Sequence, residues 1–569
     1  MNERNDLVER TRAWIAADPD PETRRELSGL LEAGKWEEIH ERMGGVLEFG
    51  TAGIRGAVEA GSNRMNRAVV IRTTAGLSRF LEERRSGPVV VGFDGRHSSP
   101  AFAEDTVGVL AAAGHEVHYF PRPVPTPFVA FQARRVGAAA AVVITASHNP
   151  PADNGYKVYD SNAAQIIPPV DGEIAAAIEE VGPASEVPRV EGALERDHPL
   201  IRPIDEDEVY EAYRQEVDGV RPRRTGSDLV VAYTPIHGVG WRILARLTRD
   251  AGYPNVNVVD AQRDPDGSFP TVEFPNPEEA GAMDLVMELG TELEADLVVA
   301  NDPDVDRLAV AVPDDVHGWR LLTGNQVGVL LADWLLESWS SPPRPIVINS
   351  IVSSPMLAEV AGAHGALFEQ TLTGFKWISN AAMDLERQGE GRFVFGYEEA
   401  LGYSVGPVVR DKDGMSAAVV FLDLAASLRE VGMSVRDRLE DLYRRVGLWV
   451  STQLSVVRPG SEGVAEIASA MDRLGEHRPR ELSGWGVASS LDFRSGAEGR
   501  PRWLPATSLV ALELEGGGRV LVRPSGTEPK LKVYVDLFGE PGADPAGAER
   551  DLTLRAEEVA ETTARFLGF

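Results

Sequence analysis

Cysteine is absent from the sequence, which excludes disulfide bonds, thiolate zinc sites and thiol nucleophiles together. Long apolar runs are missing as well. The longest one, from Val136 to Ala146, is about half of the ~18 residues that a membrane span needs. The N-terminus also lacks the apolar core of a signal peptide. These absences favour a cytoplasmic protein that makes no contact with membranes.

Basic residues are in deficit, with 57 lysines and arginines against 88 aspartates and glutamates and a formal net charge of −31. A field of this sign repels nucleic-acid phosphates and anionic headgroups, so we expect neither nucleic acid nor membrane partners. An anionic ligand must meet a local basic pocket. Lysine is especially rare, and its six copies are candidates for proton transfer, which arginine effectively cannot perform: Lys35, Lys157, Lys376, Lys412, Lys530 and Lys532.

The remaining composition is that of a globular protein, with 43% hydrophobic and 25% charged residues over 569 positions. At about 150 residues per domain, this length predicts three or four domains. Short β-branched runs end in polar or glycine-rich clusters and are followed by helical patterns, which indicates buried parallel strands in α/β units. Ligands gather beyond the carboxyl ends of such strands. The runs with their clusters are 88–99, 138–150, 228–240, 294–307, 345–355 and 392–403.

The pattern changes after Trp449, where fewer strand-and-cluster units occur. We expect a smaller α+β domain there, closed by a long acidic helix that starts near Asp544. Linker-like compositions occur at 183–203, 314–319 and 340–345. The three preceding α/β segments have a similar pattern and are candidates for diverged copies of one unit.

The sharpest motif is a group of three aspartates at alternate positions, Asp302, Asp304 and Asp306, directly after an apolar run. Alternate residues of an extended loop face one side, which makes a hard oxygen site suited to Mg²⁺. The loop is not an EF-hand, because Arg307 stands where glycine is needed and Pro313 where glutamate is needed. A solvated acidic turn is the alternative, but three carboxylates without a cation would repel one another. The motif therefore predicts a divalent metal site.

A hydroxyl stands beside an imidazole at Ser147 and His148, in the segment 145–150 that also follows an apolar run. Such a serine could be an activated nucleophile, and the Asn-Pro pair after it predicts a turn that exposes it. A plain loop with serine as a turn residue is the alternative. The surroundings do not form the Gly-x-Ser-x-Gly elbow of serine hydrolases.

A third motif, at 523–530, combines Arg523, hydroxyl side chains and a glycine. In an otherwise acidic protein these groups predict a cradle for an oxyanion, although a β-turn with a surface arginine is possible. No Walker motif and no Gly-x-Gly-x-x-Gly motif occurs in the sequence, so a nucleotide is not the expected ligand.

Two further loops are rich in glycine. The loop 396–402 holds Glu398 and Glu399, which suit hydrogen bonds to sugar hydroxyls or a solvated turn, and the loop 50–56 holds Arg55. His237 could be catalytic, but a hydrogen-bonded structural histidine is the more common case.

These motifs in this order resemble the α-D-phosphohexomutase superfamily over nearly the whole chain. The segments 50–56, 233–240, 269–279 and 374–378 are similar to its phosphoglucomutase/phosphopentomutase branch. The resemblance implies three similar α/β domains with mixed sheets and a smaller C-terminal α+β domain around a central cleft. The implied boundaries are 1–205 with the phosphoserine loop, 206–320 with the metal-binding loop, 321–448 with the sugar-binding loop and 449–569 with the phosphate-binding loop.

The resemblance also implies roles for single residues. The catalytic group would be Ser147 as phosphoserine, with Lys157, Lys376, Arg55 and His148. One Mg²⁺ per chain would be held by Ser147, Asp302, Asp304 and Asp306. The substrate would be bound by Glu398, Glu399, Arg307, Arg523, Ser525, Gly526, Thr527 and Lys530. Many hexose-specific members carry serine two residues after the sugar-loop glutamate, where this chain has Ala400.

The implied activity is interconversion of glucose 1-phosphate and glucose 6-phosphate through a phosphoserine and a bisphosphorylated sugar, with glucose 1,6-bisphosphate as activator. The alternatives are a phosphopentomutase or phosphomannomutase, or a metal-dependent sugar phosphatase. A non-catalytic sugar-phosphate sensor is disfavoured, because Ser147 and all three aspartates are present. The partners would be small sugar phosphates, and the protein a monomer or homodimer.

Overall fold

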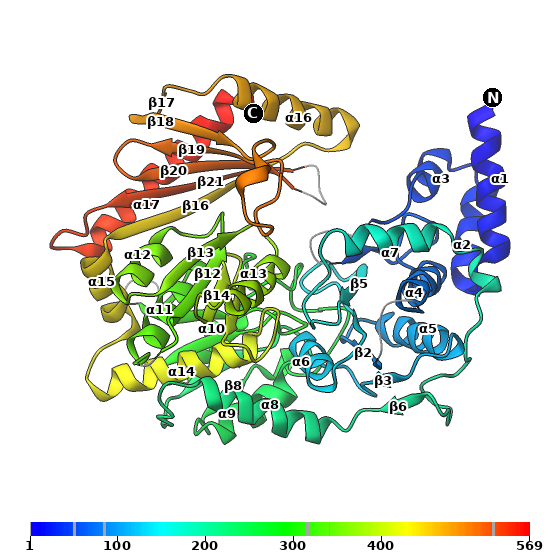
Figure 1. The fold of residues 1–569 in the computed structure, drawn as a ribbon, viewed down its shortest axis with the longest axis horizontal. Coiled ribbons are helices and arrows are strands. Elements are labelled where there is room, and N and C mark those ends of the chain that lie inside the picture. Colours follow the sequence, from blue (N-terminus) through cyan, green and yellow to red (C-terminus); the bar gives the residue numbers. More distant parts are fainter. Residues whose placement is uncertain (1, 49–52, 83–86, 315–317, 341, 526–529) are drawn as a thin grey trace. The chain divides into compact units, whose positions relative to one another are not determined.

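The computed structural model describes residues 2–48, 53–82, 87–314, 318–340, 342–525 and 530–569 (Figure 1). The chain divides into two compact units. The first comprises Met1–Leu321 and Pro407–Val419, and the second comprises Leu322–Gly406 and Val420–Phe569. Each unit is described by itself.

The first sheet of the first unit is mixed, with the order β1-β5-β4-β2-β3-β6. Its strands β2, β3, β4 and β6 run parallel, and β5 and β1 are antiparallel to their neighbours. Every residue of β2 and β4 is buried, as their continuous β-branched runs predict. The strands are β1 (Ile54–Ala57), β2 (Val89–Phe93), β3 (Val117–Tyr119), β4 (Ala140–Ile144), β5 (Asp153–Tyr159) and β6 (Ile201–Pro203).

The core of this sheet lies between its apolar residues and helices such as α4 and α5, whose buried faces include Leu77 and Phe102. The segment 183–203, which its composition predicts as a linker, instead contains η1 (Ala184–Glu186) and ends in β6, which pairs with β3. The helices of this region are α4 (Arg67–Glu82), α5 (Ser99–Ala112), α6 (Thr126–Val136) and α7 (Val170–Glu179).

Three helices precede this sheet: α1 (Asn2–Ala17), α2 (Pro21–Glu32) and α3 (Trp36–Met43). Helix α2 begins where its sequence favours a start, because the Asp20 side chain caps the amide of Glu22 and a proline occupies the first turn. The three helices share a small apolar cluster that includes Leu7, Leu27 and Ile39.

The second sheet of the first unit has the order β11-β10-β9-β7-β8, with β8, β7 and β9 parallel and β10 and β11 antiparallel. The predicted linker at 314–319 is therefore wrong: its described residues belong to the β10–β11 hairpin. The elements are α8 (Glu206–Val220), β7 (Val231–Thr234), α9 (Trp241–Asp250), β8 (Val256–Val258), η2 (Asp260–Gln262), α10 (Asp284–Glu292), β9 (Leu297–Ala300), β10 (Ala309–Asp314) and β11 (Gly318–Leu321).

The second unit begins with a third mixed sheet in the order β13-β12-β14-β15, in which only β15 is antiparallel to its neighbour among the described strands. Helix α14 starts in the first unit and continues in the second. The elements are α11 (Gly324–Glu337), β12 (Pro345–Ser350), α12 (Met356–Ala363), β13 (Leu367–Thr371), α13 (Phe375–Gln388), β14 (Arg392–Glu398), β15 (Gly402–Val405), α14 (Gly414–Glu430) and α15 (Val435–Val446).

The C-terminal part of the second unit is a fully antiparallel sheet in the order β16-β21-β20-β19-β18-β17. Helix α17 starts after the Asp544 cap, as the sequence predicts. The elements are β16 (Leu448–Val457), α16 (Gly460–Glu476), β17 (Glu481–Leu482), β18 (Trp485–Asp492), η3 (Ala497–Gly499), β19 (Val510–Leu514), β20 (Gly518–Pro524), β21 (Lys530–Gly539) and α17 (Pro545–Phe566).

The predicted fold class of three mixed α/β domains and a smaller C-terminal α+β domain is confirmed. Within the part of the chain that the structure describes, every helix is too short or too polar to cross a bilayer.

Candidate active site

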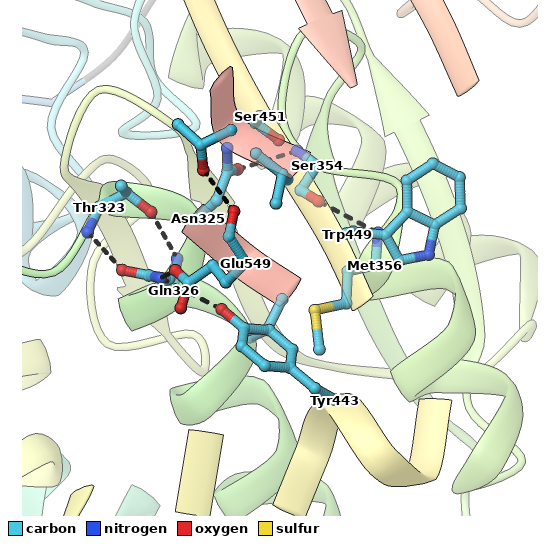
Figure 2. Close-up of a pocket in the computed structure, with 12 residues that line it drawn as sticks. Thr323, Asn325, Gln326, Ser354, Met356, Tyr443, Trp449, Ser451 and Glu549 are labelled. Carbon is cyan, nitrogen blue, oxygen red and sulfur yellow. Dashed lines mark hydrogen bonds between the residues drawn. The ribbon is translucent and has the colours of Figure 1, made fainter. Parts of the chain in front are cut away.

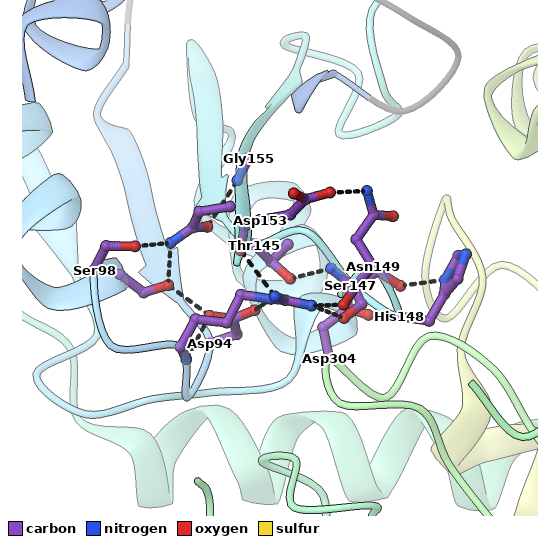
Figure 3. A network of polar contacts seen from close by, with 12 residues as sticks. Asp94, Ser98, Thr145, Ser147, His148, Asn149, Asp153, Gly155 and Asp304 are labelled. Carbon is purple, nitrogen blue, oxygen red and sulfur yellow. Dashed lines mark hydrogen bonds and ion pairs between the residues drawn. The ribbon is translucent and has the colours of Figure 1, made fainter. Parts of the chain in front are cut away.

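Ser147 lies in the loop that follows β4, with its side chain buried and its backbone in the left-handed region at φ 54°. This conformation costs a non-glycine residue about 1–3 kcal/mol and persists only where the surroundings fix it. The Ser147 amide donates to Thr145 Oγ1 over 2.8 Å. Figure 3 shows the polar network around this loop, which is ordered by contacts from several strand ends.

Arg96 holds the serine loop through its backbone oxygens. Its guanidinium donates to the backbone oxygens of Ser147 (2.8 Å), Asn149 (2.6 Å), Pro150 (2.7 Å) and Asp153 (2.8 Å). Sequence reasoning did not select Arg96. The available signal was its place in the polar cluster after β2, because β2 is the parallel neighbour of β4 and both strands end at the same edge.

The three aspartates of the metal-type loop are buried just after β9, and one carboxylate oxygen from each lies within 4.8 Å of the others. The segment after β7 supports this loop. The Val239 amide donates to Pro303 O over 2.9 Å, and a Cβ at Gly238 would lie 2.3 Å from Pro303 Cα, so only glycine fits there. Tyr233 Oη donates to Asn301 Oδ1 over 2.9 Å.

The serine and the aspartates meet in the first unit. Ser147 Oγ donates to Asp302 Oδ2 over 2.7 Å, and His148 Nδ1 lies 3.1 Å from the same hydroxyl. The two residues are 155 positions apart in the sequence, and each follows a strand of a different sheet. The two motifs that the sequence singles out therefore form one site.

Two lysines compensate part of the negative charge. Lys157 Nζ donates to Asp304 Oδ2 (2.7 Å) and Asp306 Oδ2 (3.0 Å), and Lys412 Nζ lies 3.1 Å from Asp306 Oδ2. Burial alone would lower the pKa of Lys157, but the two carboxylates outweigh burial and raise it. Burial and the neighbouring carboxylates raise the pKa of Asp302 well above its usual range.

The segment 407–419, which brings Lys412 to the aspartates, is anchored in the first unit. Asp411 Oδ2 accepts hydrogen bonds from Tyr159 Oη (2.6 Å) and Gln165 Nε2 (2.7 Å). Nearby, the Gly414 amide donates to Val305 O over 3.2 Å, directly within the aspartate loop. Lys412 is one of the six lysines that the sequence marks as candidates.

The aspartate cluster keeps unused acceptors. Asp304 Oδ1 and Asp306 Oδ1 are buried and have no hydrogen-bond partner. An unpaired carboxylate oxygen is costly to bury, whereas carboxylate oxygens are the ligands that Mg²⁺ prefers. The donor set of Asp302, Asp304, Asp306 and the Ser147 hydroxyl thus fits a hard divalent cation.

Two arginines and a histidine complete this site. Arg55, on β1, donates to Asn149 Oδ1 over 3.3 Å, and its Nε is buried without a partner. Arg307 Nη2 lies 3.4 Å from His148 Nε2. Burial, with Arg307 and Arg55 nearby, lowers the pKa of His148 well below its usual value, so its imidazole is neutral at pH 7. Residues 50–52 of the Arg55 loop lie outside the described residues.

His237 has the structural role that the sequence favours. Its Nε2 lies 2.8 Å from Thr271 Oγ1, which also accepts from Gln262 Nε2.

The predicted sugar loop belongs to the second unit. Glu398 Oε1 accepts the amide of Gly374 over 2.7 Å, two residues before Lys376 in the first turn of α13. Both Glu398 and Lys376 are 9% exposed. Glu399 Oε2 accepts instead from Ser350 Oγ and Ser353 Oγ, each over 3.1 Å.

The predicted phosphate loop connects β20 and β21 in the same unit. Arg523 pairs with Lys532 across the two strands, and the Ser525 amide donates to Lys530 O over 2.8 Å, which closes the base of the hairpin. Gly526 and Thr527 lie outside the described residues.

A separate small cavity of about 90 Å³ lies in the second unit between α11, α15, β16 and α17 (Figure 2). Its polar side chains bond one another: Gln326 Nε2 donates to Glu549 Oε1 (2.7 Å) and Tyr443 Oη (3.1 Å), and Asn325 Oδ1 accepts the Ser354 amide (2.8 Å). This network joins the start of α11 to α15, α17 and the segment before α12.

Comparisons with known proteins agree with this geometry. Four models of the family described as phosphoglucomutase/phosphomannomutase match in order: alpha/beta/alpha domains I (46–184), II (210–317) and III (323–446) and the C-terminal domain (497–540). The boundaries given above from the sequence stay predictions.

The chain is 40% identical to a probable phosphomannomutase of Haemophilus influenzae, with 86% of this chain and 95% of the relative covered. It is 34% identical to the phosphopentomutase of Mus musculus, with 96% and 93% covered. The crystal structure of a putative phosphomannomutase from Thermus thermophilus has a TM-score of 0.68 at 24% identity, covering 92% of this chain and 99% of that one. The last similarity concerns the fold alone.

Proposed function

Because the chain belongs to the phosphoglucomutase/phosphomannomutase family of the α-D-phosphohexomutase superfamily, whose members are intramolecular phosphotransferases, we propose that it interconverts glucose 1-phosphate and glucose 6-phosphate. The reaction would pass through a phosphoserine at Ser147 and through glucose 1,6-bisphosphate, which also serves as activator. The observation that carries the proposal is the 2.7 Å contact of Ser147 Oγ with Asp302, beside two buried carboxylate oxygens without partners.

The phosphoryl transfer assigns roles to groups of the first unit and to Lys376 of the second unit. A sugar hydroxyl oxygen attacks the phosphorus on Ser147, the bond from phosphorus to Oγ breaks, the sugar hydroxyl proton passes to a base, and the released Ser147 oxygen takes up a proton from an acid. We assign proton transfer to Lys157 and Lys376. Arg55, Arg307 and His148 would hold the phosphoryl oxygens, since the guanidinium groups donate in fixed directions.

We propose that Asp302, Asp304, Asp306 and the Ser147 oxygen hold one Mg²⁺. When bound, the ion would neutralise charge that develops on the phosphoryl group. Among the described residues, Lys157 pairs with Asp304 and Asp306, and Lys412 pairs with Asp306, so these two ammonium groups already hold part of the charge that the ion would share.

The second unit would supply recognition. Glu398 and Glu399 are proposed to bind sugar hydroxyls, and the distal phosphate is assigned to the loop with Arg523, Ser525, Gly526, Thr527 and Lys530. The bisphosphate must present either phosphate to Ser147, so a loop that accepts the distal phosphate in both orientations is required.

A pentose phosphate is the second candidate substrate. Ala400 replaces a serine that many hexose-specific members carry, and a phosphopentomutase is among the relatives with 34% identity over nearly the full length. A mannose phosphate is the third candidate substrate, because a relative that is 40% identical is a probable phosphomannomutase.

One panel of assays separates these substrates. Glucose, mannose and pentose 1-phosphates are each supplied with Mg²⁺ and the matching bisphosphate, and isomerised sugar and inorganic phosphate are both quantified. We expect the highest kcat/KM with glucose 1-phosphate and no net phosphate release. Release of phosphate without isomerised sugar would instead identify a phosphatase, and absence of both products would contradict the proposal. Size-exclusion chromatography decides between the two expected states, monomer and homodimer.

A further inference from the structure

The C-terminal sheet packs against the loop that follows β12, within the second unit. The contact has an apolar layer formed by the loop residues Ile351 and Val352 and by side chains of the C-terminal part: Phe493, Leu509, Ala511, Leu521 and Tyr534. Every residue of this cluster is less than 9% exposed. The loop and the sheet therefore form one packed body.

A largely buried arginine extends this contact with polar groups. Arg519, on β20, donates from Nε to Asp536 Oδ2 over 2.8 Å and from Nη2 to Ser353 O over 2.7 Å. The side chains of Arg519 and Asp536 are 12% and 2% exposed. Asp536 Oδ1 accepts Ser451 Oγ over 2.5 Å, so the carboxylate is held on both sides. A charged bridge at this depth costs desolvation and is strongly destabilising to break.

Ser353 connects this bridge to the predicted sugar loop. Its backbone oxygen accepts from Arg519, while its hydroxyl accepts the Glu399 amide over 3.0 Å and lies 3.1 Å from Glu399 Oε2. Ser350 Oγ lies 2.8 Å from Ser353 Oγ and 3.1 Å from the same carboxylate oxygen. A displacement of Ser353 would therefore displace both the backbone and the side chain of Glu399.

The same arginine stands on the strand that leads into the predicted phosphate loop. Arg519 and Arg523 are four residues apart on β20, so their side chains leave the same face of the strand, about 13 Å apart at ~3.3 Å per residue. The strand is paired with β21 over this whole length, from Arg519 opposite Asp536 to Arg523 opposite Lys532. The two arginines therefore stand on one continuously paired stretch of strand.

We propose that Arg519 is a positioning residue that couples the phosphate-binding hairpin to the sugar loop through Ser353. The two loops then recognise one sugar phosphate as a single element. This inference rests on the proposed function of both loops. It goes beyond that function, because it predicts that binding contributions of residues far apart in the sequence are not independent.

The test is a mutant cycle measured in two backgrounds. Arg523→Ala, Glu399→Gln and the double variant are compared by kcat/KM for glucose 1-phosphate. In the wild-type background we expect the loss in the double variant to differ by about 5-fold or more from the product of the single losses, since coupled sites typically interact at this level. In the Arg519→Lys background, the loss in the double variant should equal the product of the two single losses to within about 2-fold.

Lysine suits this background because it keeps a positive charge beside Asp536 but cannot donate in two fixed directions to Asp536 and Ser353. On its own, Arg519→Lys should raise KM several-fold and leave kcat within about 2-fold, because it does not touch the phosphoryl group. Ser353→Ala removes only the hydroxyl that contacts Glu399. It should abolish the coupling as well, which keeps the test valid if Arg519→Lys fails to fold.

Arg344→Lys is the matched control. Arg344 also donates to two backbone oxygens of the second unit, those of Gly365 (3.0 Å) and Ala366 (2.8 Å), but it makes no contact with the sugar loop. The coupling should be unchanged in this background. Multiplicative losses in wild type, or equal coupling in the Arg519→Lys and Arg344→Lys backgrounds, would overturn the inference. Failure of the proposed function is distinguishable, because wild type would then turn over no sugar phosphate. The same cycle would in that case be measured by calorimetry with glucose 1,6-bisphosphate.

Discussion

Two buried aspartate sites of this protein, one a cluster and one a single residue, are surrounded in opposite ways. In the first unit, Asp302, Asp304 and Asp306 share Lys157 and Lys412, and two carboxylate oxygens remain without partners. In the second unit, Asp333 stands alone among several cationic or protonatable groups. Its Oδ1 lies 2.8 Å from His364 Nε2, and its Oδ2 lies 2.7 Å from Arg438 and from Arg445.

On the proposed function, the first site is a functional cluster and the second a structural aspartate. Burial would raise the pKa of Asp333, but the hydrogen bonds of Arg445 and His364 and the charges of the two arginines outweigh it, and the pKa is lowered. The charge of Asp333 is thus stabilised by the fold itself. At Asp302 the pKa is raised, because burial and two further carboxylates act in the same direction. At Asp304 and Asp306 burial would raise the pKa, but Lys157, joined at Asp306 by Lys412, outweighs burial and lowers it. Asp302 is thus the carboxylate whose charge the proposed cation would have to stabilise.

The largest effect is expected at the functional cluster. Ser147→Ala removes one hydroxyl and, on the proposed mechanism, the only phosphoryl acceptor, so turnover should fall by on the order of 10³-fold or more. The unfolding free energy should change little. Intact-protein mass spectrometry should find a phosphorylated fraction in wild type and none in the variant. A Ser147→Ala enzyme with wild-type turnover would refute the mechanism.

Asp304→Asn tests whether the functional cluster holds a metal. A neutral amide cannot replace the carboxylate charge, so we expect phosphoryl transfer to slow by on the order of 100-fold and the Mg²⁺ requirement to rise. Mg²⁺ should raise the melting temperature of wild type, as any ligand of the folded state does, and should do so less for the variant. Activity that survives chelation in wild type would count against the assignment.

Asp333→Asn should lower stability and leave catalysis unchanged, in contrast to the two variants of the active site. We expect a loss of about 2 kcal/mol in unfolding free energy and the kcat of wild type. Because the folded-state pKa of Asp333 is lowered, its charge stabilises the protein above the pKa of the unfolded state, and this stabilisation is lost as the pH falls. Urea unfolding should therefore give a difference between wild type and variant that is full at pH 7 and shrinks below about pH 4. A difference that does not change with pH would contradict the assignment of charge to Asp333.

Arg445→Gln is the smallest of these changes. The Arg445 side chain is 37% exposed, and Arg438 still contacts the same carboxylate oxygen, so solvent screens most of the loss. We expect about 0.5 kcal/mol, within the range of exposed ion pairs, from the same urea titration. A loss as large as that of Asp333→Asn would mean that the two arginines act only together.

The sequence predicts the fold class and the centre of the site because both are encoded locally. Continuous β-branched runs indicate buried strands, and the aspartate and serine motifs each lie within one loop. Arg96 and Arg519 could not be selected in this way, since each acts on backbone oxygens that only the folded chain brings near. The pairing of β10 with β11 could not be predicted, because the segment 314–319 has the polar composition of a linker.

The return of residues 407–419 to the first unit has a consequence for how this molecule can be divided. The aspartate loop is complete only with Lys412, which is translated about 100 residues after it. A gene truncated after the codon of Leu321 would therefore yield an N-terminal fragment in which the carboxylates lack one of their two ammonium partners. In this fragment, Tyr159 and Gln165 would also lack their hydrogen-bond acceptor, Asp411. Each unit is compact but consists of two separate stretches of the chain. A single crossover between related genes therefore cannot exchange either unit.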